Sequence, residues 1–306
     1  MTRAYSDRAT LAAFAAVVLL GGGNGVSVRF SDRELAPFWG ATIRFGLAAA
    51  VLMGVVIVAR ISLPRGRALL GSVLYGLFAF AGAFGLIYWG LVETPAGLGQ
   101  IILALVPLLT LLLAVVQRQE PFRWRGLFGA LIAIVGIAIV FGGRVGTAVP
   151  IVSALAVVAA AACMAESNVV VKHFPKSHPV ATNAVAMATG AAILFGATLL
   201  TGEPMTTPAR TETWIAIGYL ALIGSVAVFS LFLYVIARWS ASVSSYVMLL
   251  MPLVTVALSA VLDHEAVTAG YLIGGPLVLV GVYIGAFAPA RVRSPTLPTV
   301  ATPGCA

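Results

Sequence analysis

Long apolar runs, separated by short polar gaps, fill most of the chain. Each run is close to the roughly 20 residues that an α-helix needs to cross a bilayer. The gaps carry arginine, proline and glycine, which favour turns and loops. The pattern therefore predicts an all-α membrane protein with ten transmembrane helices. The predicted spans are residues 10–29, 37–59, 68–91, 96–117, 126–142, 149–172, 179–200, 213–237, 241–262 and 270–288.

The second half of this pattern repeats the first. With a shift of 145 residues, 96–139 aligns with 241–284 and 13 of the 44 positions are identical. The identical pairs include Pro107/Pro252, Thr110/Thr255, Glu120/Glu265, Gly129/Gly274 and Gly136/Gly281. A shift of 144 residues pairs Asn24 with Asn168. Each half would hold five helices, an odd number, so the second half would lie inverted in the membrane. Inverted repeats of this kind are typical of transporters.

The repeat divides the chain into four predicted segments. Residues 1–9 form a cytoplasmic N-terminus, 10–145 the first five-helix repeat and 146–288 the second. Residues 289–306 are rich in proline and small polar residues, so we expect a disordered cytoplasmic tail.

Composition places most of the chain in lipid. Hydrophobic residues make up 61% of it and charged residues 9%, against about 25% charged in a soluble domain. The net charge of +8 would suggest nucleic acid in a soluble protein, but these residues lie mostly in loops and indicate membrane orientation instead. With the N-terminus inside, 13 Lys and Arg fall in inner loops and four in outer loops. This bias predicts a multi-pass inner-membrane protein with both termini cytoplasmic.

Two segments carry a resemblance to a known family. YWGLVETPAGLGQIILALVPLLTLLLAVVQRQEPFRWRGLFGALIAIVGI contains a helical hairpin, Pro107, Glu120 and a glycine-spaced helix, and PFWGATIRFGLAA contains Arg44. Together they resemble the drug/metabolite transporter superfamily. The resemblance implies ten helices, both termini inside and metabolite export, with the best fit to the branch that exports amino acids and related aromatic or cationic compounds. The glycine-rich stretch 21–25 departs from the family, because many members have an aromatic residue there.

Polar residues within a span are costly in lipid, so each is a candidate for the substrate site. The substrate-binding candidates are Asn24, Tyr88, Trp89, Gln100, Asn168, Tyr234, Ser244, Ser245 and Tyr246. We expect Gln100 and its repeat mate Ser245 to face each other near the pseudo-twofold axis. Amides and hydroxyls can solvate an ammonium and a carboxylate, and aromatic rings can hold a cation. The alternatives are hydrogen bonds that only join helices and aromatic residues at the membrane interface.

Four further residues have candidate roles. Glu166 lies within a predicted span and could couple transport to protons, or it could reach toward water or pair with a lysine. Arg44 could bind a carboxylate or anchor the helices. Pro107 and Pro252 lie mid-span at equivalent positions and would act as matched hinges or as structural kinks.

The motifs of other functions are missing. The chain has no phosphate-binding loop, no H-E-x-x-H motif and no metal-ligating spacing around Cys163 or Cys305. We therefore expect no metal, no cofactor and no enzyme activity. The sequence favours a secondary transporter or facilitator that exports small metabolites by alternating access, with a small-molecule substrate and the bilayer as partners, and nothing in it requires more than a monomer. The alternatives are an intramembrane enzyme or lipid-handling protein, a proton-coupled exporter of nucleosides or drugs, and a membrane scaffold.

Overall fold

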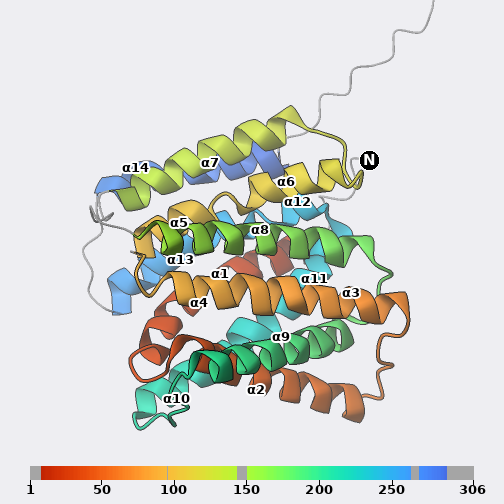
Figure 1. Ribbon diagram of the computed structural model, residues 1–306. Coiled ribbons are helices and arrows are strands. Elements are labelled where there is room, and N and C mark those ends of the chain that lie inside the picture. Colours follow the sequence, from red (N-terminus) through yellow and green to blue (C-terminus); the bar gives the residue numbers. More distant parts are fainter. Residues whose placement is uncertain (1–7, 95, 143–149, 263–268, 288–306) are drawn as a thin grey trace, which may run out of the picture.

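The computed structural model describes residues 8–94, 96–142, 150–262 and 269–287. All regular elements in this part of the chain are helices (Figure 1). Ten of the helical segments are long and apolar enough to cross a membrane, which confirms the prediction of a ten-helix all-α membrane protein. The predicted tail and Glu265 lie outside the described residues.

The helical elements of the first half are α1 (Arg8–Ser31), α2 (Pro37–Val58), α3 (Arg67–Tyr75), η1 (Gly76–Phe84), α4 (Gly85–Gly90), α5 (Ala96–Leu103), α6 (Val106–Val116) and α7 (Trp124–Gly142). Those of the second half are α8 (Ile151–His173), α9 (Pro179–Thr201), α10 (Thr211–Gly218), η2 (Tyr219–Ala227), α11 (Val228–Arg238), α12 (Ala241–Ser244), α13 (Val247–Leu262), α14 (Ala269–Val282) and η3 (Tyr283–Phe287). Elements α3, η1 and α4 are one continuous span, as are α10, η2 and α11. Proline is the first residue of both α2 and α9, a position where its missing N–H is not needed.

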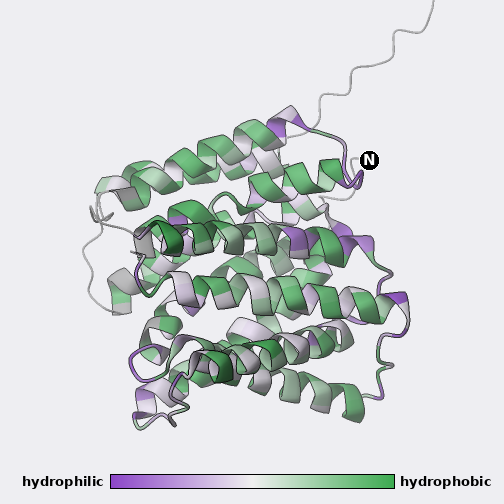
Figure 2. Ribbon diagram, viewed as in Figure 1, coloured by the Kyte–Doolittle hydropathy of each residue, from purple (hydrophilic) through white to green (hydrophobic). Residues whose placement is uncertain are grey.

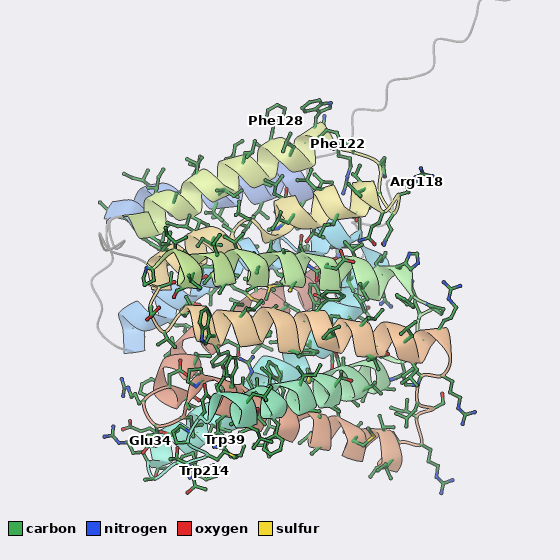
Figure 3. All side chains as sticks on the ribbon, viewed as in Figure 1. Glu34, Trp39, Arg118, Phe122, Phe128 and Trp214 are labelled. Atoms are coloured by element: carbon green, nitrogen blue, oxygen red, sulfur yellow. The ribbon has the colours of Figure 1, made fainter. Side chains whose placement is uncertain are left out.

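The most hydrophilic residues lie mainly at the two ends of the helical bundle, and hydrophobic residues cover most of its length (Figure 2). Successive spans run in opposite directions, so alternate loops share an end. We call the end with the loops after spans two, four, six and eight the basic face. Its described Lys and Arg residues are Arg8, Arg60, Arg65, Arg67, Arg118, Arg123, Arg125, Lys172, Lys176 and Arg238. We call the other end the acidic face; its described acids are Asp32, Glu34, Glu93, Glu203 and Glu212. Figure 3 shows Arg118 at one end, with Glu34, Trp39 and Trp214 at the other.

Helix packing follows the repeat. Equivalent helices of the two halves pack against each other, α7 against α14 at one edge of the bundle and α2 against α9 at the other (Figure 1). Between these edges α1 packs on α13, and the equivalent helix α8 packs on α5 and α6. Each of these contacts therefore has a counterpart made by the equivalent helices of the other half, as expected of two related five-helix units.

Spans three and eight share a feature that the sequence did not predict. Each contains a π-helical segment, η1 in the first half and η2 in the second. A π-turn holds one residue more than an α-turn and is found frequently at functional sites. Neither segment contains proline, so hydropathy and turn signals gave no sign of them.

The contact between α7 and α14 depends on glycine. A Cβ atom on Gly281 would lie 2.6 Å from both the Ala133 nitrogen and the Gly129 oxygen, and one on Gly136 would lie 2.8 Å from the Gly274 oxygen. Real Cβ atoms do not approach backbone so closely, and small residues let membrane helices come together in this way. The glycines that repeat between the halves are therefore points of close backbone contact where α7 meets α14.

We expect Gly274→Ala to destabilise the protein by about 1–3 kcal/mol, because the new methyl group would collide with the backbone of α7 at Gly136. The neighbouring Gly275 has no atom within 4 Å of the equivalent position, so Gly275→Ala should be neutral or slightly stabilising through helix propensity. Thermal unfolding of both variants in one detergent tests this. Equal unfolding midpoints would contradict the packing.

Candidate functional site

Arg44 is the one charged residue among the buried residues of the described chain, with 1% of its surface exposed. Its Nε donates to the Ser225 hydroxyl at 3.0 Å and its Nη2 to the Gly224 carbonyl at 3.2 Å. The guanidinium also lies 5.0 and 5.1 Å from the ring centroids of Phe45 and Phe84. Hydrogen bonds and aromatic faces together compensate a charge that lipid could not solvate. Arg44 thus joins α2 to η2.

Asn24 reaches the same carbonyl from α1. Its Nδ2 donates to the Gly224 oxygen at 3.3 Å, while its Oδ1 is buried with no hydrogen-bond partner among the described residues. The carbonyl that receives both side chains belongs to the π-helical segment, and the Ser225 hydroxyl bonds five residues back to the Leu220 oxygen at 2.8 Å. Spans one, two and eight therefore meet at one polar cluster, which we call the Gly224 cluster: Asn24, Arg44, Gly224 and Ser225.

Asp32, which the sequence analysis did not single out, lies on the acidic face beyond the end of α1. The residue as a whole is exposed, yet many protein atoms lie around its carboxyl. This burial raises the pKa of Asp32 to about 7, although the positive charge of Arg44 acts to lower it. Tyr88, only 6% exposed, also lies within electrostatic range of Asp32 and Arg44. The only signal in the sequence was an acid shortly after an apolar run, and that is common in loops.

The two asparagines of the repeat have different partners. Asn168 donates from Nδ2 to the Thr110 hydroxyl at 3.5 Å, within the interface of α8 and α6. The repeat mate of that threonine, Thr255, donates to the Gly22 carbonyl at 2.7 Å and joins α13 to α1. The threonines thus join equivalent spans in the two halves, Thr110 as an acceptor and Thr255 as a donor, whereas Asn24 and Asn168 bind unrelated partners.

Gln100 and Ser245 also differ in their surroundings. The Gln100 side chain is half-buried and has no hydrogen-bond partner in the part of the chain that the structure describes. Ser245 is fully buried, and its hydroxyl donates to the Ser242 carbonyl at 2.8 Å. No hydrogen bond joins the two. Of this pair, Gln100 alone offers an amide to a ligand.

Ser244 and Tyr246 lie in packed surroundings toward the basic face. The Tyr246 hydroxyl donates to the Gly126 carbonyl at 2.9 Å, and Gly285 packs against the same hydroxyl. The Ser244 hydroxyl is buried without a partner among the described residues. These contacts join the start of span nine to spans five and ten, and we call this place the helix joint.

Beside that joint, Glu120 and Arg123 bind the start of span nine. Glu120 accepts hydrogen bonds from the Ser242 nitrogen at 3.1 Å and from the Ser242 hydroxyl. Arg123 donates to Ser242 at 2.8 Å and to Ser240 at 3.1 Å. The loop after span four is thereby tied to span nine at the basic face.

Three other candidates lie at the periphery. Trp89 is 41% exposed and lies with Phe38 in a groove of about 270 Å³ between spans two, three and seven. The guanidinium carbon of Arg238 lies over the ring of Tyr234, 3.5 Å from the ring centroid. Glu166 accepts both of its hydrogen bonds, 3.0 and 2.8 Å, from Gln117 in an exposed position.

The two prolines do not form matching breaks. Span four is interrupted at residues 104–105, just before Pro107, which is the second residue of α6. Span nine is interrupted at residues 245–246, and Pro252 lies inside the continuous helix α13. A hinge role for Pro107 and Pro252 stays a prediction, with the break in each half at a different place.

No group of three or more His, Cys, Asp or Glu residues that could hold a metal ion is found in the described ranges. The chemistry that the arrangement offers is therefore that of hydrogen bonds, aromatic faces and the charges of Arg44 and Asp32.

We expect the stability of the protein to depend on pH near neutrality through Asp32. A carboxyl whose pKa is about 7 when folded, against 3.8 ordinarily, binds its proton more tightly in the folded state. Its contribution to stability is thus present at low pH and is lost as the pH rises through about 7. As the pH is raised from about 6 to about 8, the thermal unfolding midpoint of the wild type should therefore fall further than that of Asp32→Asn, which has no carboxyl to titrate at this position.

Glu34 provides the matched control, because the Thr213 hydroxyl holds the pKa of its carboxyl below the usual value. The wild type and Glu34→Gln should therefore change in parallel over this range. Parallel curves for the wild type and Asp32→Asn would mean that Asp32 does not titrate there.

Several known transporters are similar to this chain. An uncharacterized inner membrane transporter of Escherichia coli (strain K12), YedA, is 24% identical over 256 residues, covering 83% of this chain and 82% of its own. A probable amino-acid metabolite efflux pump of Salmonella typhimurium is 27% identical over 292 residues, covering 90% and 94%. A probable terminal-alkyne amino-acid exporter of Streptantibioticus cattleyicolor is 29% identical over 225 residues, covering 72% and 74%.

Fold and family comparisons agree with these relatives. A solved crystal structure with 20% sequence identity superposes with a TM-score of 0.81, covering 94% of this chain and 99% of the other, which shows the same fold. The model of the EamA-like transporter family matches twice, over residues 8–142 and 151–286. The predicted membership of the drug/metabolite transporter superfamily is thus confirmed: the chain belongs to the EamA-like transporter family.

Proposed function

We propose that the protein is a secondary transporter that exports small metabolites, in particular amino acids or related aromatic and cationic compounds, by alternating access. The repeat supports this proposal most directly. Equivalent helices of the two halves pack against each other at both edges of the bundle, so two nearly equivalent conformations can open to opposite sides. The relatives that are named amino-acid metabolite efflux pump and amino-acid exporter support the substrate class.

Hydrogen bonds join the two halves at the acidic face. Glu34 accepts a hydrogen bond from the Thr213 hydroxyl at 2.5 Å and one from the Arg210 nitrogen at 3.2 Å. Trp39 donates from its backbone to Glu203 at 3.0 Å and from its indole to the Thr206 carbonyl at 2.8 Å. In an alternating-access cycle these links would break when the substrate leaves on the acidic side.

Orientation follows from the sorted charges. The positive-inside rule assigns the basic face to the cytoplasm. Both termini would then be cytoplasmic, and Asp32 would face the outside. Export would run from the basic face to the acidic face, past the Gly224 cluster.

The coupling mechanism has two candidates. Glu166 is occupied by Gln117 in an exposed position, which favours facilitated diffusion over coupling through this acid. Asp32, whose pKa is about 7, could exchange a proton near neutral pH. It is therefore the candidate residue for the proton-coupled alternative. Relatives are named transporters or efflux pumps, and an intramembrane enzyme remains the alternative of a different class.

A substrate panel with the purified protein in liposomes tests the proposal. We expect saturable flux of some member of a panel of amino acids, nucleosides and organic cations. Flux without any pH gradient would identify a facilitator, and flux only with an imposed proton gradient would identify a coupled exporter. No flux above that of empty liposomes for the whole panel would contradict the transporter.

Gln100→Ala should raise the KM of the transported substrate about three- to tenfold, the loss of roughly one hydrogen bond to the ligand, without lowering thermal stability. Ser245→Ala is the matched control, because its hydroxyl is used within the protein and its loss should lower stability rather than affinity. An unchanged KM in Gln100→Ala would remove Gln100 from the substrate site.

A further inference from the structure

A cavity of about 180 Å³ opens on the basic face between α3, α8, α9 and α11. Its lining is apolar except for Ser72, Lys172, Lys176, Ser177 and Thr182. Sites for drug-sized ligands measure about 300–1,000 Å³, so this cavity suits a small solute or the polar head of a larger one.

Both lysines of the whole chain line this cavity. The sequence contains 16 arginines and only two lysines, Lys172 and Lys176, which are four residues apart and close enough to repel each other. A compact ammonium differs from guanidinium in being a strongly hydrated point charge with three donors that can turn toward an anion. Every ammonium side chain of the protein is thus found at one place.

Both ammonium groups are held by hydrogen bonds to backbone carbonyls, but not all of their N–H donors are used. Lys172 donates to the Ile236 carbonyl at 2.7 Å and to the Trp239 carbonyl at 2.8 Å. Lys176 donates to the Ala237 carbonyl at 3.0 Å. Each ammonium has three N–H donors, so these bonds to the end of α11 leave one donor on Lys172 and two on Lys176.

Helix ends of both kinds meet at the cavity. The first turns of α3 and α9 line it through Ala68 and Pro179, and the last turns of α8 and α11 line it through Lys172 and Ile236, so the partial charges of these helix ends oppose one another and the lysines supply the net positive charge. The cavity has no acidic lining residue among the described residues. Glu120, the acid within electrostatic range of Lys172, is already bound by Ser242 and Arg123.

The equivalent place on the acidic face is built differently. With the 144-residue shift, Lys176 corresponds to Asp32 and His178 to Glu34. There Glu34 accepts a hydrogen bond from Thr213 of α10. The basic face therefore has two ammonium groups beside a cavity, and the equivalent place on the acidic face has two carboxyls, one of them bonded within the protein.

We propose that this cavity is a binding site for a small anionic group, a carboxylate or a phosphate, held by Lys172 and Lys176. The anion is either the acid group of a solute that approaches from the basic face or the headgroup of an anionic lipid. If it is a solute, the cavity is where the substrate first docks; that role rests on the proposed transport function, whereas anion binding itself does not.

Amine acetylation tests the site on the full chain, because only Lys172, Lys176 and the N-terminal amine can react. The protein is placed in nanodiscs of neutral phosphatidylcholine and treated with a water-soluble acetylating ester, and the modified lysines are followed by mass spectrometry. Acetate or inorganic phosphate should slow acetylation of Lys176 about three- to tenfold. Acetamide, or sodium chloride at equal ionic strength, should not.

The lipid arm replaces part of the phosphatidylcholine with phosphatidylglycerol. Protection by acetate or phosphate in neutral lipid supports a site for a free anion, and protection only with phosphatidylglycerol supports a headgroup site. If acetylation is the same under all these conditions, the proposal is wrong. The assay needs no transport, so its failure is distinguishable from failure of the proposed function.

The role in transport is tested with two variants of Lys176. If leucine is a substrate, Lys176→Gln should raise its KM about three- to tenfold, while Lys176→Arg keeps the charge and should stay near the wild type. The KM for leucinamide, which has no carboxylate, should be the same in all three proteins. An equal rise for leucine and leucinamide would show a structural effect and overturn the docking role.

Discussion

Lipid offers no hydrogen bonds, so each polar group within the spans must be satisfied by the protein itself. Arg44 shows how far this constraint reaches. Its guanidinium requires the Gly224 carbonyl, the Ser225 hydroxyl and two phenylalanine rings. Meeting these needs fixes α2 against η2, and Asn24 adds α1 to the same point. The placement of spans one, two and eight depends on how this one charge is accommodated.

The same constraint explains which predictions the sequence allowed. Ten spans and two repeats follow from hydropathy and from aligned residues such as Gly129 and Gly274, because the length of each apolar run and the position of each glycine can be read directly from the sequence. The π-helical segments could not be predicted, since no residue type specifies them. The partners of Asn24 and Asn168 could not be predicted either, because each partner is about 60 or 200 residues away.

The candidate site residues differ in how far the protein uses their polar groups. Asn24 and Gln100, predicted as substrate contacts, keep hydrogen-bonding capacity that the described residues do not use. The Tyr246 hydroxyl donates to Gly126, and the Glu166 carboxylate accepts from Gln117. Asp32 was missed because its raised pKa comes from the protein atoms that surround it in the fold, and it persists against the opposing charge of Arg44. Two related halves have thus kept their helix packing while their polar groups diverged, which gives the two faces opposite charge.

The wide turns in spans three and eight have a consequence for how these helices tolerate change. In an α-helix with 3.6 residues per turn, one additional residue rotates everything after it by about 100°. A wide turn absorbs that residue locally, so Phe84 and Tyr88 keep the side of the helix that faces Arg44. A span of this kind can gain or lose one residue over evolutionary time without turning its functional side chains into the lipid.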